Sequence, residues 1–137
     1  MADVLRLVRD AGLPVEGLAG AALVLVVDGR GELVGTIALE EHGGGEGLAY
    51  LLRSAAVAPA WRGRGVGGAL TRAALTHVDG AGAPVALLTE TADGYFSGFG
   101  FEPVARDRLP AALMASLELR GACPDSARAM LRPPRGA

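Results

Sequence analysis

Residues 61–70 read WRGRGVGGAL, a run of glycine and arginine between two apolar segments. The apolar run before it ends at Val57, and the segment after it has helical periodicity. Glycines let a backbone approach a ligand closely, and the free N–H groups at a helix N-terminus favour anions. Guanidinium groups add charge-assisted hydrogen bonds. The run therefore predicts a binding site for a phosphate-rich ligand at the start of a helix.

Two classes of phosphate-rich ligand use glycines in this way. Gly63, Gly65 and Gly68 spell the G-x-G-x-x-G pattern of dinucleotide-binding folds. That pattern normally follows a strand directly and opens the fold, whereas here residues 58–62 intervene and an antiparallel hairpin precedes. The same residues fit R-x-x-G-x-G better, beginning at Arg62. The alternative is that no ligand binds here and that the glycines only allow the chain to turn.

Composition limits the class of protein. The chain has 137 residues, half of them hydrophobic, and a formal net charge of -2, which predicts one globular domain and no nucleic-acid partner. Its longest apolar run, residues 18–27, is too short to span a membrane, and a cytoplasmic location is expected. The chain contains no lysine, which excludes a lysine-dependent phosphate loop and a pyridoxal Schiff base. One cysteine and two histidines predict neither a disulfide nor a metal site.

Hydrophobic periodicity predicts alternating helices and strands without an internal repeat. An antiparallel hairpin turns at residues 28–31, and one βαβ crossover contains the glycine run, so the class is α/β or α+β with a mixed sheet. Helices are expected at Val4–Ala11, from the glycine run to about Val78, at Ala92–Phe99 and at 111–119. Strands are expected at Ala21–Val27, Glu32–Glu40, Leu48–Val57, Val85–Thr89, Phe101–Arg106 and 126–131, before a frayed tail at 132–137.

Two stretches carry a resemblance to a known family. Residues 55–70, AAVAPAWRGRGVGGAL, and residues 92–101, ADGYFSGFGF, resemble the two motifs of GNAT-fold N-acetyltransferases, at the correct separation. The likeness covers about residues 20–106, within a single domain that spans 1–137. It implies a largely antiparallel sheet, splayed at a central bulge near residues 55–57 and flanked by helices. It also implies acetyl-CoA as acetyl donor and a primary amine as acceptor.

The resemblance implies where the cofactor lies. The glycine run would bind its pyrophosphate, and the pantetheine arm would pair with the strand edge opened by the bulge. Thr89 stands where the family commonly has an asparagine that touches the cofactor. The expected cofactor-binding residues are Ala55, Ala56, Val57, Arg62, Gly63, Arg64, Gly65, Val66, Gly67, Gly68 and Thr89.

A narrower resemblance extends beyond the general fold. Residues 51–67, residues 87–101 and the stretch CPDSARAM at 123–130 are similar to small arsenic-resistance N-acetyltransferases of the ArsN type. Their association implies an acceptor that is an arsenical, amino-acid-like in form. A thiol–arsenic role for Cys123 competes with an ordinary structural role, because one cysteine supplies a single thiolate.

Candidate catalytic residues follow from the chemistry of acetyl transfer. The attacking amine must be neutral, so a base or a water chain removes its proton, and Glu40 at the end of the second strand is the first candidate. Glu41 and His42 are the alternative candidates for the base. If Glu40 has no catalytic role, it is a solvated carboxylate at the end of a strand. The family's usual acid position holds Phe96, so the neighbouring Tyr95 is the candidate acid. A partly buried aromatic residue is the alternative for Tyr95.

Arg53 is the candidate acceptor-binding residue. It lies in a strand that is otherwise apolar, and a charge is rarely buried there without a partner. Either it binds an anionic group on the acceptor or it forms an ion pair with a nearby acid such as Glu40.

Three hypotheses about function remain open from the sequence. The first is an acetyl-CoA-dependent N-acetyltransferase that acts on a small amine with an anionic group. The second is a coenzyme A-binding module without catalysis, which Phe96 at the acid position would permit. The third is a dinucleotide-binding protein. Related folds are often dimers, so a homodimer is compatible with the first two.

Overall fold

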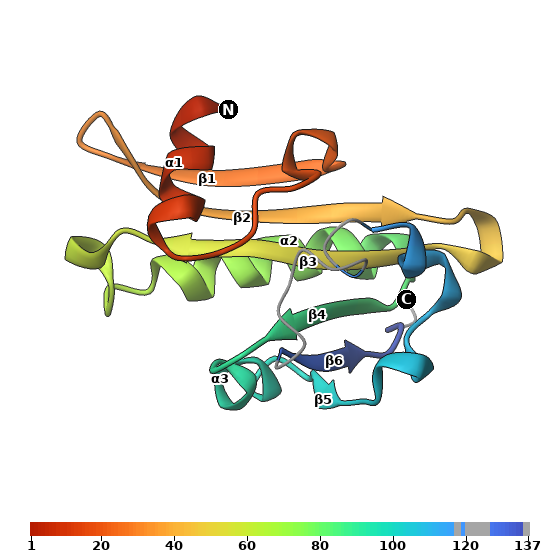
Figure 1. Cartoon of the computed structure of the whole chain (residues 1–137). Coiled ribbons are helices and arrows are strands. Elements are labelled where there is room, and N and C mark those ends of the chain that lie inside the picture. The colour runs from red at the N-terminus through yellow and green to blue at the C-terminus, as the bar shows by residue number, and fades with distance from the viewer. Residues whose placement is uncertain (117–118, 120–126, 136–137) are drawn as a thin grey trace.

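A computed structural model of the chain describes residues 1–116, 119 and 127–135. Within that part the chain forms three α-helices on a six-stranded sheet of order β1-β2-β3-β4-β6-β5 (Figure 1). The helices are α1 (Ala2–Asp10), α2 (Val66–Ala81) and α3 (Asp93–Ser97). The strands are β1 (Leu23–Gly29), β2 (Glu32–His42), β3 (Ala49–Val57), β4 (Val85–Thr89), β5 (Glu102–Pro103) and β6 (Arg128–Arg132).

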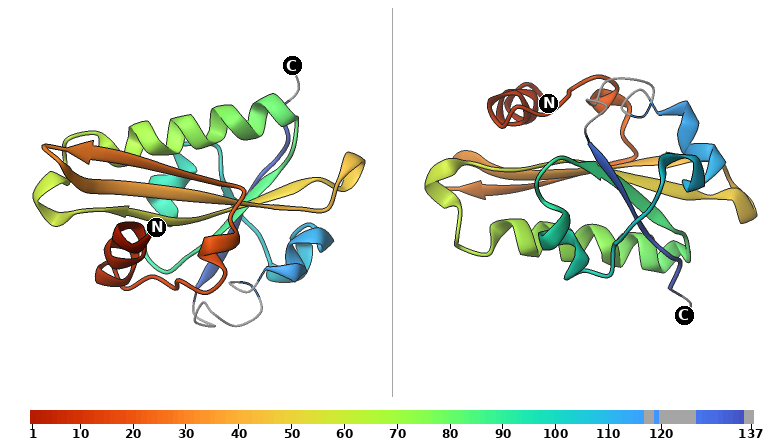
Figure 2. Two further views of the ribbon diagram at one scale, coloured as in Figure 1. Left: turned by 90° about the horizontal axis from the view of Figure 1, so that it is seen from above. Right: turned by 60° about the horizontal axis from the view of Figure 1, so that its bottom comes forward.

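Helices cover both faces of the sheet. Figure 2 shows α2 and α3 on one face and α1 on the other. On the α2 face, Leu70, Ala74 and Val78 pack on residues of β2 and β3 such as Ile37 and Leu52. On the other face, α1 and the turn at Leu18–Gly20 pack on β2, and Leu109 and Leu113 pack on the C-terminal half of the sheet. The sheet is therefore buried from both sides over most of its width.

The sheet opens between β3 and β4. These two strands pair in parallel only at Tyr50↔Val85 and Leu51↔Ala86, whereas β4 pairs with β6 along its whole length. Beside the opening, β3 carries one residue more than β2 between Thr36↔Ala56 and Ala38↔Arg53. This bulge places Ser54 at φ +59°, in the left-handed region. The predicted splayed sheet is confirmed, and the bulge lies at the start of the predicted stretch.

Most predicted elements are present, and two differ. The expected strand at Phe101–Arg106 is reduced to the two residues of β5; one further backbone bond, from the N–H of Val104 to the carbonyl oxygen of Ala129, follows before the 3₁₀ turn at Arg106–Arg108. Within the described part of the expected helix at 111–119, residues Ala111–Ala115 form a 3₁₀ helix, where the N–H of Leu113 and of Ser116 bonds back three residues; residues 117–118 lie outside the described part. Arg132, expected at the start of a frayed tail, is the last residue of β6 and is buried.

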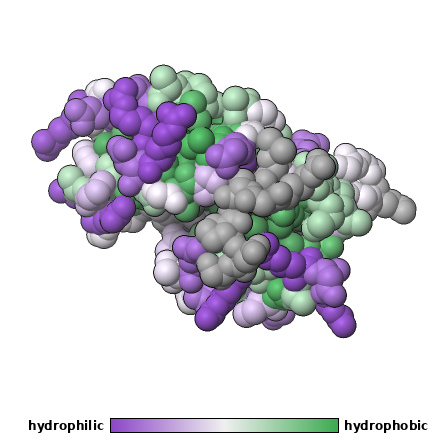
Figure 3. Space-filling view, viewed as in Figure 1, coloured by the Kyte–Doolittle hydropathy of each residue, from purple (hydrophilic) through white to green (hydrophobic). Residues whose placement is uncertain are grey.

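The surface carries no uniformly apolar face in the view of Figure 3, where hydrophilic side chains interrupt the hydrophobic patches. No helix in the described part of the chain is long and apolar enough to cross a membrane.

Candidate active site

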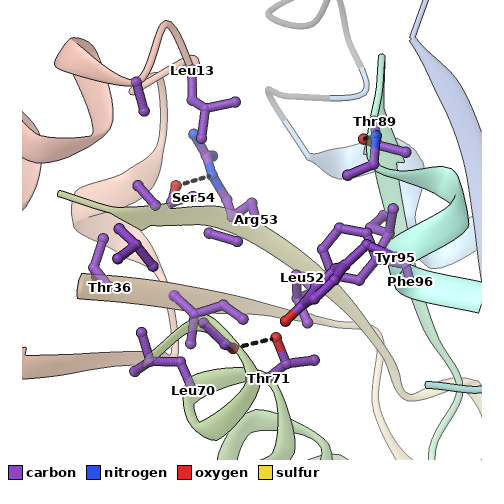
Figure 4. Close-up of a pocket in the computed structure, with 18 of the residues that line it drawn as sticks. Leu13, Thr36, Leu52, Arg53, Ser54, Leu70, Thr71, Thr89, Tyr95 and Phe96 are labelled. Carbon is purple, nitrogen blue, oxygen red and sulfur yellow. Dashed lines mark hydrogen bonds between the residues drawn. The ribbon is translucent and has the colours of Figure 1, made fainter. Parts of the chain in front are cut away.

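A cavity of about 830 Å³ occupies the opening between β3 and β4. It is lined by the ends of both strands, the loop and first turn of α2, α3, and the segment after α1 at residues 11–14. Figure 4 shows Arg53, Ser54 and Leu13 on one side of β3 and Leu70, Thr71 and the Tyr95 hydroxyl on the other. The cavity thus reaches both faces of the sheet through the opening.

The glycine loop forms the wall of this cavity at the start of α2. Gly63 and Gly65 have φ of +77° and +82°, a conformation that side chains with a β-carbon rarely adopt. Gly65 is the N-cap of α2, so the N–H groups of the next residues have no partner inside the helix. Together with the helix dipole, these groups make the loop suited to an anion.

The two arginines of the loop differ in position. Arg62 lines the cavity, and its Nε donates to the carbonyl oxygen of Val57 at 3.2 Å, which ties the loop to the end of β3. The guanidinium of Arg64 lies 4.9 Å from the centre of the Trp61 ring, in a cation–π contact, and Arg64 is not part of the cavity wall.

Tyr95 and Phe96 have opposite roles in packing. Phe96 is buried and its ring meets Phe101 edge to face. Tyr95 is 47% exposed and lines the cavity, with its ring against Phe96 and Phe99. Its hydroxyl lies 3.6 Å from the position a β-carbon would take on Gly67. Of the two aromatic residues, Tyr95 therefore presents a hydroxyl to the cavity, beside the first turn of α2.

Arg53 is buried at the bulge and holds several groups at once. Its Nη1 donates to Glu40 Oε2 at 2.7 Å and to the carbonyl oxygen of Glu16 at 2.6 Å. Its Nη2 donates to the carbonyl oxygen of Pro14 at 3.0 Å, and its Nε contacts the Ser54 hydroxyl at 3.3 Å. The ion pair with Glu40, one of the two interpretations of Arg53, is present. Arg53 also belongs to the cavity lining, but its side chain has no exposed surface.

Glu40 lies behind Arg53 and is not part of the cavity wall. Its other carboxylate oxygen is 2.7 Å from Nε2 of His42. Burial raises the pKa of Glu40, but hydrogen bonds from His42, Arg53 and Ser116 and the charge of Arg53 outweigh it and hold that pKa below its usual value. Glu40 is therefore a charged carboxylate held by hydrogen bonds. Glu41, the next residue in the strand, is exposed and points to the opposite face of the sheet.

Further residues line the cavity with polar groups. Thr89 Oγ1 accepts a hydrogen bond from the N–H of Ala92 at 3.0 Å, which fixes the start of α3.

Two parts of the cavity wall were not predicted from the sequence. They are Ser54, whose position depends on the bulge, and residues 11–14, which carry no motif. Within the described residues no cluster of metal-binding side chains is present, and Cys123 lies outside them.

Comparison with known proteins identifies the fold. Residues 20–103 match the model of the acetyltransferase (GNAT) domain family. No curated protein sequence matches the chain. Among solved structures, N-acetylglutamate synthase from Neisseria gonorrhoeae, complexed with coenzyme A and N-acetyl-glutamate, has a TM-score of 0.78 at 19% identity. The match covers 98% of this chain and 33% of that one, so the chain spans about a third of the synthase.

Two further structures are similar. Rv2747 from Mycobacterium tuberculosis, in complex with CoA and NLQ, has a TM-score of 0.73 at 20% identity, covering 96% of this chain and 94% of that one. A GNAT family acetyltransferase from Brucella melitensis, in complex with acetyl-CoA, has a TM-score of 0.52 at 36% identity, covering 69% of this chain and 60% of that one.

Proposed function

The chain belongs to the GNAT acetyltransferase family, and from this premise we propose that it transfers the acetyl group of acetyl-CoA to a small primary amine that carries an anionic group. The observation that carries the proposal is the cavity, which passes through the opened sheet and is bounded by the glycine-rich start of α2. A donor and an acceptor that enter from opposite faces would meet at the opening.

The donor is assigned to the α2 side. The N–H groups at the start of α2 suit the pyrophosphate, and Arg62 adds a positive charge at the same wall. Residues 55–57 of β3 and Thr89 of β4 border the opening, where a pantetheine arm can pair with the unpaired backbone edge. Arg64, over Trp61, would contact the cofactor only from outside the cavity.

The reaction we propose is direct attack. The neutral amine nitrogen bonds to the thioester carbonyl carbon, and the oxyanion is stabilised by a backbone N–H near Ala56 or Val57. The intermediate then releases coenzyme A as the C–S bond breaks, and the Tyr95 hydroxyl donates a proton to the thiolate. The N-protonated amide loses its proton to solvent, and solvent returns a proton to the Tyr95 phenolate. Because Glu40 does not line the cavity, we assign it an indirect role: it positions Arg53.

The acceptor is assigned to the Arg53 side. Four of the five N–H groups of Arg53 are engaged by Glu40, Glu16, Pro14 and Ser54, which leaves one on Nη2. The Arg53 side chain has no exposed surface, so a carboxylate on the acceptor would accept hydrogen bonds from this N–H and from the Ser54 hydroxyl only if the wall beside them shifts on binding. The similar synthase is complexed with N-acetyl-glutamate, an acetylated amine with carboxylates. An amino-acid-like arsenical, as the ArsN resemblance suggests, meets the same description.

The test is turnover with a panel of amines, measured as release of free thiol from acetyl-CoA. Amines with a carboxylate, arsonate or phosphonate group should be acetylated faster than their esters or plain alkylamines. Binding of acetyl-CoA without turnover on any amine would instead support a coenzyme A-binding module without catalysis. A plain alkylamine as best substrate would contradict the anionic acceptor.

Arg53→Lys tests the residue assigned to the acceptor. Lysine keeps a positive charge opposite Glu40 but lacks the planar fork, so we expect the fold to persist. KM for a carboxylate acceptor should rise at least about tenfold, the equivalent of about 1.4 kcal/mol. KM for acetyl-CoA and for the esterified acceptor should change less than twofold. Equal increases for acid and ester would show that Arg53 only shapes the cavity.

A further inference from the structure

The hairpin of β1 and β2 meets the glycine loop at two glycines that lie outside the cavity wall. Figure 2 shows the end of this hairpin at the same end of the sheet as the loop that leads from β3 into α2. The two residues are Gly29 of β1 and Gly35 of β2, and neither lines the cavity. Neither has a φ in the left-handed region, so a residue with a β-carbon could adopt the same backbone conformation. Glycine is therefore needed at both positions for space alone.

The space at Gly29 is filled by the ring of Trp61. A β-carbon on Gly29 would lie 2.5 Å from Cζ2 and 2.6 Å from Cη2 of that ring, whereas carbon atoms in contact are normally about 3.5–4.0 Å apart. The guanidinium of Arg64 lies 4.9 Å from the centre of the same ring, and the N–H of Trp61 donates to the carbonyl oxygen of Ala58 at 2.8 Å. Any side chain on Gly29 would therefore displace a ring on which the loop is built.

The space at Gly35 is filled by the first turn of α2. A β-carbon on Gly35 would lie 2.6 Å from Cγ1 of Val66 and 3.1 Å from Cδ1 of Leu70. The end of a leucine side chain can shift, but valine in a helix is held in one rotamer. Because Val66 is the first residue of α2, it can give way only if the start of the helix moves.

The two glycines thus receive the two ends of the loop, residues 61–66. Trp61 and Val66 both line the cavity, and each glycine lies one layer behind one of them. Between them, the N–H of Ala58 donates to the carbonyl oxygen of Val34 in β2 at 2.7 Å. The hairpin therefore supports the loop from behind along its whole length.

We infer that Gly29 and Gly35 are positioning residues for the acetyl donor: the room they leave for Trp61 and Val66 sets the geometry of the loop that binds the pyrophosphate. This inference rests on the proposed function. A methyl group at either position would push the facing atom by roughly 1 Å to restore normal contact. Groups that bind a ligand must be held within about 0.5 Å of their productive positions, so the loop N–H groups would lose the phosphate oxygens.

The test measures the Kd for coenzyme A by titration calorimetry. Gly29→Ala and Gly35→Ala should each raise this Kd at least about tenfold, the equivalent of about 1.4 kcal/mol. The control is Gly80→Ala in α2, where no atom lies within 4 Å of an added β-carbon, and Kd should change less than about twofold. With the best amine of the panel, KM for acetyl-CoA should rise in the two hairpin variants and KM for the amine should not. Loss of folded protein alone would lower the apparent kcat and leave both KM values unchanged.

Compensating changes test the contacts themselves. Val66→Ala removes the atom that a β-carbon on Gly35 would meet, so Gly35→Ala/Val66→Ala should bind coenzyme A within about twofold of Val66→Ala alone. Trp61→Phe should compensate for Gly29→Ala in the same way. These comparisons hold even if a single glycine variant does not fold.

Each outcome is distinct. Unchanged Kd in Gly29→Ala and Gly35→Ala would overturn the inference and leave the proposed function standing. A further tenfold loss in the double variants, relative to Val66→Ala or Trp61→Phe alone, would show that these contacts do not set the loop and would also overturn it. If the unaltered protein does not bind coenzyme A, the proposed function fails, and the inference fails with it.

Discussion

Arg53 links parts of the molecule that are distant in sequence. Its guanidinium connects a carboxylate of β2, two carbonyl oxygens of the segment between α1 and β1, and the bulge of β3. That segment begins as a wall of the cavity at residues 11–14. A buried charge is tolerated only with partners of this kind. The ion pair with Glu40 therefore stabilises the part of the molecule where the segment after α1 meets β2 and β3.

Glu40→Gln should destabilise the protein through Arg53. Removing one partner leaves a buried charge unpaired, which costs about 3–5 kcal/mol in the free energy of unfolding. The matched control is Glu41→Gln, exposed and next in the strand, where we expect a change within about 0.5 kcal/mol. Urea denaturation at neutral pH measures both. Similar values for the two variants would mean that the ion pair contributes no stability.

The destabilisation caused by Glu40→Gln should depend on pH, in a direction that the pKa of Glu40 defines. The pKa of Glu40 is lowered on folding from its ordinary value of 4.5. Its contribution to stability is therefore full above that ordinary value and is lost as pH falls through the folded pKa. Glu40→Gln should lack this loss, so the stability gap between it and the unaltered protein narrows on acidification.

At the scale of elements, the glycine loop and α2 form one functional unit, but its glycines serve different purposes. Gly65 has a φ of +82° with open space around it, so its backbone conformation needs glycine. Gly67 lies inside the helix with ordinary φ. There an added methyl would lie 3.6 Å from the Tyr95 hydroxyl and from Val57 Cγ2, at normal contact distance.

Gly65→Ala and Gly67→Ala should therefore separate stability from binding. Gly65→Ala should lower the free energy of unfolding by about 1–2 kcal/mol, the cost of a left-handed residue with a β-carbon. Gly67→Ala should keep or raise stability, since alanine is favoured over glycine in a helix by about 0.5–1 kcal/mol. It should nevertheless raise the Kd for acetyl-CoA at least about tenfold, because the methyl enters the cofactor wall. Urea denaturation and calorimetry measure the two effects. Unchanged affinity in Gly67→Ala would contradict the cofactor assignment.

Local patterns predict most elements of the fold. The Asp28–Gly31 turn, the glycine loop and the apolar run Val85–Thr89 each depend on neighbouring residues alone, and β4 has the predicted bounds. The segment 101–116 is harder, because the extent of its elements depends on pairing with β6 and on what packs beneath them. There the predicted strand shortens and the predicted helix becomes 3₁₀.

The candidate site is less accessible to sequence reasoning than the fold. A motif marks the glycine loop, but the bulge at Ser54 results from register against β2, which no local pattern reveals. The Arg53–Glu40 pair could be anticipated as an alternative, since the two residues belong to adjacent strands.

At the scale of the whole molecule, the sheet consists of two halves with a weak connection. Strands β1, β2 and β3 pair over long stretches, as do β4 and β6, but the halves share only the two residue pairs between β3 and β4. The cavity lies where this connection ends, and residues of both halves line it. A ligand bound there would contact both halves and add to the interactions that hold them together.

Acetyl-CoA should therefore stabilise the protein, and NAD should not. At a ligand concentration about 100 times Kd, binding adds about 2.7 kcal/mol to the free energy of unfolding. For a domain of this size, that raises Tm by roughly 10 °C. Amide hydrogen exchange should slow in β4 and α3, on the far side of the opening, as well as at the start of α2. Stabilisation by NAD alone would support the dinucleotide alternative. Protection confined to α2 would show that the ligand contacts only one half of the sheet, because a pantetheine arm between β3 and β4 must shield both.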